Sequence, residues 1–213
     1  MTMWKKLFLN YKIIPFFRRL PNRKMAIFVH IPKTAGTSLK RSLGFPVAGK
    51  SKGKYRKHHT IPEMRAILPE KVWDRAFKFS IIRNPWDRMV SYYLFTKRKA
   101  FEKRGEVDFP DFKSWLHETL ENEDLYQTIF MPQAAWLYDE QGQLMVDYVG
   151  RFENLETAYA EICAALKIDV PAELRHLNAS KRSGSYHDFY DADTKALVAR
   201  VCAEDVERFD YKF

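Results

Sequence analysis

Cysteine is scarce in this chain, with only Cys163 and Cys202 among 213 residues. Each lies in an apolar run with helical spacing. This favours two buried thiols, although a single disulfide between them stays open. No Cys-x-x-Cys pair and no mixed cysteine and histidine spacing indicates a metal centre. The sequence also has no internal repeat and no low-complexity tract, so we expect an ordinary globular chain.

The N-terminal segment 1–24 is basic and aromatic, but it lacks the run of about 20 apolar residues that spans a bilayer. Asn10, Lys12 and Pro15 interrupt its apolar patches. Without a clean apolar region or a small-residue cleavage site, we do not expect a signal peptide. Two interpretations stay open: a segment lying on an anionic membrane, or a poorly packed leader. We therefore expect a leader at 1–24, one domain at 25–213 and a cytoplasmic location, with peripheral contact at the inner membrane face as the open alternative.

Acidic residues are too few to balance the basic ones, 27 against 36, which gives a formal charge of +9. That excess favours a polyanionic partner: a nucleotide, a nucleic acid, an acidic glycan or an anionic membrane. Hydrophobic residues make up 46% of the chain and charged residues 30%, which is enough apolar material for a packed core. Composition does not choose among the anionic partners, and it indicates no oligomeric state.

Strand and helix patterns alternate along the chain. Short apolar runs predict strands at 25–31 and 77–83 and within 144–156, and helical spacing predicts helices at 37–45, 61–76, 84–105, 109–121, 153–168 and 191–209. Alternation of this kind is typical of an α/β fold with a central, mostly parallel sheet and helices on both faces.

The stretch "FVHIPKTAGTSLK", residues 28–40, has the pattern of an anion-binding turn. A strand feeds a turn and then a helix, whose first N–H groups and dipole favour negative charge. Lys33 adds a point charge, Gly36 permits close approach of the backbone, and hydroxyls follow at Thr37 and Ser38. The ATPase pattern GxxxxGK[ST] is absent, because the lysine precedes the glycine here and the first glycine is missing. No strand ends in a metal-binding aspartate either.

A second turn of this type follows the strand at 77–83. Arg83 ends that strand, Asn84 is placed to cap the next helix, and Pro85 suits its first position. Ser91 lies eight residues beyond Arg83, so an anion beside the helix start could contact both side chains. Each residue taken alone would more simply be structural, Arg83 as an ion-pair partner and Ser91 as a surface hydroxyl.

Together, "HIPKTAGTS" and "IIRNPWDRMVSYY" resemble the paired signatures of PAPS-dependent sulfotransferases. The chain is most similar to carbohydrate sulfotransferases of the heparan sulfate 2-O type and their small bacterial relatives. "KHHT", "VDYVGRFENL" and "NASKRSGSYHDFY" extend the resemblance over about residues 25–211. It implies a P-loop-like three-layer sandwich and a donor, 3′-phosphoadenosine 5′-phosphosulfate (PAPS), that leaves as 3′,5′-ADP (PAP) without a metal.

The resemblance also assigns roles to single residues. It implies that Lys33 contacts the 5′-phosphate and the leaving oxygen, and that Arg83 and Ser91 bind the 3′-phosphate. Lys181 or Arg182 would close over the nucleotide. The 5′-phosphate would be cradled by Thr34, Ala35, Gly36, Thr37 and Ser38.

A histidine in the loop between the two motifs would remove the acceptor proton. In "KHHT" that position is His58, with His59 as its competitor and a solvated pair as the simpler alternative. His30 precedes the first loop and is expected to be structural. The family implies a carbohydrate or glycoconjugate acceptor, for which Gln133 is our choice of contact residue. Trp136 and its aromatic neighbours are expected mostly in the core.

Two other functions stay open. An ATP-dependent kinase on a P-loop fold would need a lysine after Gly36 and magnesium ligands, and neither is visible. A nucleotide-binding protein without activity would not require His58. We expect no nucleic acid partner, because the two phosphate motifs account for the basic charge.

Overall fold

A computed structural model describes residues 16–46, 58–105, 108–121, 130–169 and 184–213. The chain divides into two compact units, which we describe separately. Unit 1 comprises Met1–Ile82 and Ala135–Asn178, and unit 2 comprises Arg83–Ala134 and Ala179–Phe213.

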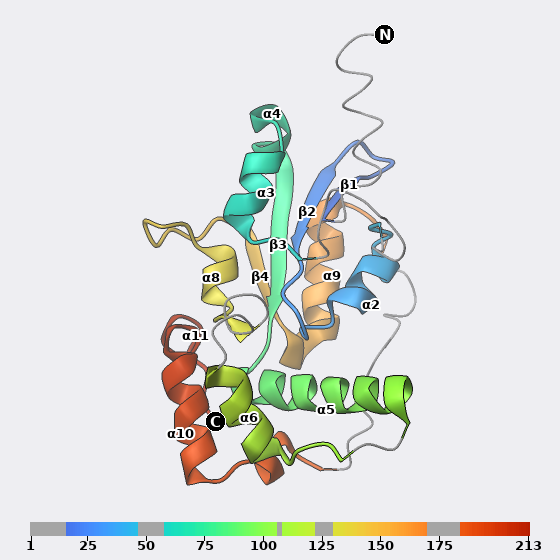
Figure 1. Cartoon of the computed structure of the whole chain (residues 1–213). Coiled ribbons are helices and arrows are strands. Elements are labelled where there is room, and N and C mark those ends of the chain that lie inside the picture. The colour runs from blue at the N-terminus through green and yellow to red at the C-terminus, as the bar shows by residue number, and fades with distance from the viewer. Residues whose placement is uncertain (1–15, 47–57, 106–107, 122–129, 170–183) are drawn as a thin grey trace. The chain divides into compact units, whose positions relative to one another are not determined.

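Unit 1 is built on a four-stranded sheet in the order β1-β2-β3-β4 (Figure 1). The strands are β1 (Phe17–Arg19), β2 (Met25–Val29), β3 (Ala76–Ile82) and β4 (Tyr148–Arg151). β2, β3 and β4 are parallel, and β1 pairs antiparallel with β2 at the edge. The predicted, mostly parallel sheet is therefore confirmed.

Alternate residues of β3 face different helices, as the period of two in a strand requires. Phe79 and Ile81 pack in one core cluster with residues of α2 (Gly36–Ser42) and α9 (Leu155–Leu166). Lys78 points to the other face, where its Nζ lies 5.6 Å from the ring centre of Trp73 in α4 (Glu70–Trp73). Helices thus cover both faces, as expected of the α/β fold.

Two parts of unit 1 differ from the sequence prediction. β1 lies inside the segment expected to be a leader, so the ordered sheet begins before residue 25. The helix predicted at 61–76 is divided into α3 (Ile61–Ile67) and α4. Leu68 adopts an extended conformation, as is typical of a residue that precedes proline, and Pro69 caps α4.

Unit 2 contains the long helix predicted from residue 84. α5 runs from Pro85 to Arg104, and the Asn84 side chain accepts hydrogen bonds from the N–H groups of Trp86 and Asp87. The Asn84 amide in turn donates to the carbonyl of Lys212 at 2.8 Å. The start of α5 is therefore fixed by its own cap and by the last residues of the chain.

Further helices of unit 2 pack on α5 through aromatic side chains. α6 (Phe112–Glu121) and the short helix η4 (Tyr186–Phe189) contribute rings that contact Tyr93, with centroid separations of 5.4 Å to Phe112 and 6.2 Å to Phe189. α10 (Ala192–Val201) and α11 (Ala203–Arg208) end the fold. They were predicted as one helix, but the helix is interrupted at Cys202. Both cysteines are buried free thiols.

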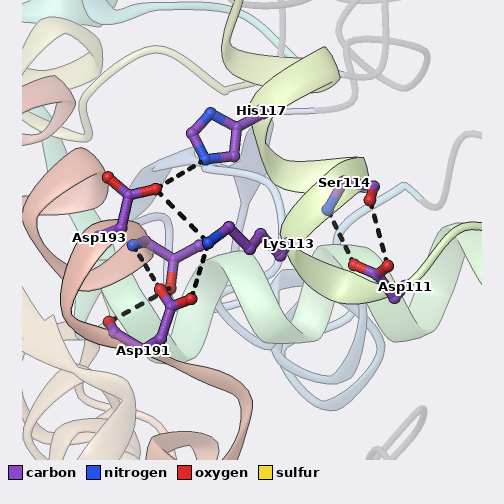
Figure 2. A network of polar contacts seen from close by, with 7 residues as sticks. Asp111, Lys113, Ser114, His117, Asp191 and Asp193 are labelled. Atoms are coloured by element: carbon purple, nitrogen blue, oxygen red, sulfur yellow. Dashed lines mark hydrogen bonds and ion pairs between the residues drawn. The ribbon is translucent and has the colours of Figure 1, made fainter.

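A polar network connects α6 with the beginning of α10 (Figure 2). Asp191 accepts from the N–H of Thr194 at 2.8 Å and thereby caps α10. Lys113 donates to Asp191 at 3.0 Å, and a ring nitrogen of His117 lies 3.2 Å from Asp193. The bonds from Thr194 and Lys113 hold the pKa of Asp191 well below its usual range. Among the described residues, no helix has the length and apolar character needed to cross a membrane.

Candidate active site

The loop that follows β2 has an unusual backbone. Lys33 and Ala35, separated by one residue, both adopt left-handed conformations, with φ values of 70° and 62°. Non-glycine residues in this region cost about 1–3 kcal/mol each and are concentrated at ligand-binding and catalytic sites. The strained loop lies where the sequence predicted an anion-binding turn.

The first turn of α2 is free of acidic residues, and its N-cap residue, Ala35, makes no side-chain capping bond. N–H groups in a first turn have no carbonyl one turn earlier, so those of Gly36 and Thr37 are placed to serve an anion. Lys33 is half-buried. The Thr34 side chain is buried, and its hydroxyl donates to the carbonyl of Ile31 at 3.0 Å. Its single hydroxyl hydrogen is thus already used, which leaves the backbone N–H as its contribution to a phosphate.

Gly36 is required by its contact with His30. A Cβ atom at this position would lie 1.8 Å from His30 Cδ2 and 2.1 Å from Nε2, far inside van der Waals contact. The imidazole of His30 is buried and stacks on Phe28, with ring centres 5.6 Å apart. We expected Gly36 to admit a phosphate to the backbone. The structure adds a second reason, which is room for a histidine ring.

His58 is held by the backbone of His30. Its Nδ1 lies 2.7 Å from the His30 carbonyl oxygen, and the two imidazole rings are 4.5 Å apart. A carbonyl oxygen only accepts, so Nδ1 carries the proton, and in the neutral ring Nε2 is the unprotonated nitrogen. His58 is half-buried, and the ring of Trp136 meets it edge-on at 6.3 Å. Trp136 itself is in the core, as expected.

His59 has different surroundings. Its side chain is buried against Phe16, with ring centres 5.2 Å apart, and its Nδ1 lies 3.6 Å from Glu63. Glu63 also accepts from the N–H of Thr60, the N-cap residue of α3. His59 is therefore held in the core and Thr60 at the N-cap of α3, while the ring of His58 contacts His30.

The second predicted turn leaves the sheet at the carboxyl end of β3. β2 and β3 are adjacent and parallel, so their carboxyl ends lie at the same edge of the sheet, the usual position of ligand sites in α/β folds. Arg83 is buried, and its Nε donates to Asp87 at 2.7 Å. Asp87 and Ser91 both lie in α5, one turn apart, so the ion pair attaches the Arg83 guanidinium to the helix that carries Ser91. Ser91 is also buried.

Gln133 has an environment that does not favour the acceptor contact we expected. Its side chain is fully buried, and its amide bonds to the backbone of Arg83 and to Asp205. Lys181 and Arg182 lie outside the described residues, so the loop predicted to close over the nucleotide stays a prediction. Within the described ranges, no cluster of three or more metal-ligating side chains is present.

Three participants were missed in the sequence. The His30 carbonyl is a backbone group, and Asp205 is far from Arg83 along the chain, so neither leaves a local signal. Asp87 did leave one, because it is an acid in the first turn of the predicted helix, four residues after Arg83.

Comparison with known proteins identifies the family. A model of the sulfotransferase family matches residues 17–212. The chain belongs to the sulfotransferase family. Over 113 residues, this sulfotransferase is 31% identical to an uncharacterised protein of Archaeoglobus fulgidus, and the match covers 52% of the chain and 82% of that protein. The prediction of a PAPS-dependent sulfotransferase is confirmed by this membership.

The sulfotransferase was matched with two solved structures. Mouse sulfotransferase SULT7A1, complexed with PAP, has a TM-score of 0.50 at 11% identity, covering 86% of this chain and 84% of its own. A sulfotransferase from Alicyclobacillus acidocaldarius has a TM-score of 0.44 at 18% identity, covering 86% and 93%. At such low identity, the likeness to the mouse enzyme concerns the fold alone.

Proposed function

We propose that the protein transfers the sulfuryl group of PAPS to a hydroxyl of a carbohydrate or glycoconjugate, with His58 as the general base. The acceptor oxygen forms a bond to sulfur while the bond between sulfur and the bridging oxygen breaks. The acceptor proton passes to Nε2 of His58, and PAP leaves with the bridging oxygen on its 5′-phosphate. Atoms and charge balance without a further reactant.

The observation that carries this proposal is the 2.7 Å contact between His58 Nδ1 and the His30 carbonyl. It selects the tautomer whose Nε2 can accept a proton. Once the ring is protonated, the same N–H becomes a charge-assisted donor to the carbonyl, which stabilises the imidazolium. His59 lacks this arrangement, because it packs against Phe16 and Glu63. The contacts therefore support His58 over its neighbour.

The donor residues fit a nucleotide with phosphates at both ends. Lys33 and the first turn of α2 would hold the 5′-phosphate, and Lys33 would offset the charge that develops on the bridging oxygen. Arg83 and Ser91 would hold the 3′-phosphate. The Arg83 Nε donates to Asp87, and a guanidinium, with five N–H donors and a permanent positive charge, suits a phosphate. Ala35 and Ser38 would contribute as part of the same phosphate loop.

The carbohydrate acceptor rests on the resemblance of the two motifs. We no longer assign Gln133 to it, because that side chain is buried. Transfer of radiolabelled sulfur from PAPS to a panel of glycans, phenols and tyrosine peptides would test the acceptor class. Labelling confined to phenols or tyrosine would contradict the carbohydrate proposal and leave the donor site intact.

Nucleotide binding separates a sulfotransferase site from a kinase site. Calorimetry should give tight binding of 3′,5′-ADP without metal, and much weaker binding of 5′-AMP, which lacks only the 3′-phosphate. ATP should bind weakly with or without Mg²⁺. Tight, magnesium-dependent ATP binding together with weak 3′,5′-ADP binding would contradict the proposal and favour the kinase alternative.

A further inference from the structure

The buried side chains of Gln133 and Asp205 form a clamp on the backbone of Arg83. Gln133 Oε1 accepts from the N–H of Arg83 at 2.8 Å, and Gln133 Nε2 donates to the carbonyl of the same residue at 2.7 Å. A backbone N–H can only donate and a carbonyl can only accept, so these two contacts fix the orientation of the amide. One glutamine thus satisfies both backbone groups of one residue.

Asp205 holds the glutamine in place. Its carboxylate accepts from Gln133 N at 2.8 Å, from Gln133 Nε2 at 3.1 Å and from Ala134 N at 2.8 Å. Gln133 and Asp205 are both fully buried. Burial raises the pKa of Asp205, while the positive charge of the buried Arg88 opposes that shift. A buried polar group whose hydrogen bonds are satisfied in this way is rigid.

The clamp acts where the chain has no regular structure. Arg83 lies between Ile82, the last residue of β3, and Asn84, the N-cap of α5, so the sheet ladder has ended and the helical ladder has not begun. Without Gln133, rotation of this backbone would swing the side chain away from α5. At its other end, the guanidinium is bonded to Asp87. Arg83 is therefore fixed at the backbone and at the side chain before any ligand binds.

We infer that Gln133 and Asp205 are positioning residues that orient Arg83 for the 3′-phosphate and so contribute to selection of the donor. This inference rests on the proposed role of Arg83. Neither side chain has a surface to offer a nucleotide, so both act through the arginine. Preorganisation of this kind reduces the conformational entropy lost on binding, and its benefit is confined to ligands that use the arginine.

The test compares binding of 3′,5′-ADP and 5′-AMP to the parent and to Gln133→Leu. We expect the affinity ratio of the two nucleotides to fall by about tenfold, the worth of one or two net hydrogen bonds. Binding of 5′-AMP should change much less, because it does not use Arg83. In the transfer reaction, KM for PAPS should rise while kcat changes little.

The control is Tyr93→Phe, which also removes a hydrogen bond within unit 2, the one from the Tyr93 hydroxyl to the Pro110 carbonyl. It should lower stability without altering the nucleotide ratio. A folded Gln133→Leu protein that keeps the parent ratio would overturn the inference. If the parent itself binds both nucleotides equally, the proposed role of Arg83 fails first.

A measurement on the parent covers the case in which Gln133→Leu does not fold. Hydrogen exchange should show the Arg83 amide strongly protected in the absence of nucleotide, because its partner is a buried side chain. Exchange as fast as that of an exposed loop amide would overturn the clamp.

Asp205→Asn provides a second variant, which turns an acceptor oxygen into a donor facing N–H groups. It should lower the nucleotide ratio in the same direction, and an unchanged ratio in folded protein would overturn the part assigned to Asp205.

Discussion

Replacement of Gly36 by alanine tests the link between the phosphate loop and the base. The added Cβ would lie 1.8 Å from His30 Cδ2, whereas carbon atoms in contact are about 3.5 Å apart, so the imidazole would have to retreat by about 1.7 Å. The ring has little room to do so, because Phe28 stacks on it at 5.6 Å and His58 lies at 4.5 Å. Movement of His30 should therefore displace His58.

Two magnitudes follow from that displacement. Overpacking of a filled core costs about 1–3 kcal/mol of unfolding free energy, which for a chain of this size lowers the melting temperature by about 2–4 °C per kcal/mol. Misplacement of a reacting group by about 1 Å can cost about 10²-fold in rate. We expect Gly36→Ala to remain folded, with kcat lowered by about 10–100-fold. Thermal unfolding and single-turnover transfer from PAPS measure the two effects.

A double-mutant cycle with His30→Ala identifies the cause. If overlap with the imidazole is responsible, Gly36→Ala should cost little stability in the His30→Ala background, because the space has been vacated. If the glycine serves only to admit the phosphate, its replacement should change the free energy of unfolding by the same amount in both backgrounds. The second result, or full activity of the single variant, would refute the reasoning.

Three further predictions concern other described residues. Lys33→Ala should stay folded by circular dichroism while kcat falls by about 10²–10³-fold, as for loss of other charge-stabilising donors, and an unfolded variant would instead indicate a structural lysine. Arg83→Ala should lower the affinity for 3′,5′-ADP by about 10–100-fold and leave 5′-AMP nearly unaffected in calorimetry. Asp191→Ala should lower the melting temperature at neutral pH. Because the native pKa of Asp191 is depressed, this loss should shrink as the pH falls below about 4, through the native pKa, and a constant loss would contradict the cap.

Local patterns predicted the parts of the fold that local chemistry determines. Asn84 and Pro85 marked the start of α5 because capping and the fixed φ of proline act within one turn. β1 was missed because it has three residues and belongs to the sheet only through pairing with β2. The division of the last helix at Cys202 was missed because the apolar periodicity of residues 191–209 continues through it.

The candidate site also contains some residues that local motifs predict and others that only long-range contacts reveal. Lys33, Gly36 and Arg83 could be proposed because they occur in two long motifs, and His58 because it lies in the short stretch KHHT between them. The role of Gln133 could not be found in this way, because its partner Asp205 lies 72 residues farther along the chain. A glutamine near aromatic residues is equally compatible with sugar binding and with burial. Only the fold shows that its amide is already bonded.

The most direct test of the account is the pH dependence of sulfuryl transfer in the parent, His58→Ala and His59→Ala. With His58 as the base, the parent should show a low-pH limb that reports a histidine ionisation. In His58→Ala the rate should fall by about 10²–10⁴-fold and the limb should vanish, while 3′,5′-ADP still binds. His59→Ala should retain the limb and most of the rate. Near-full activity of His58→Ala, or loss of the limb only in His59→Ala, would contradict the assignment of the base.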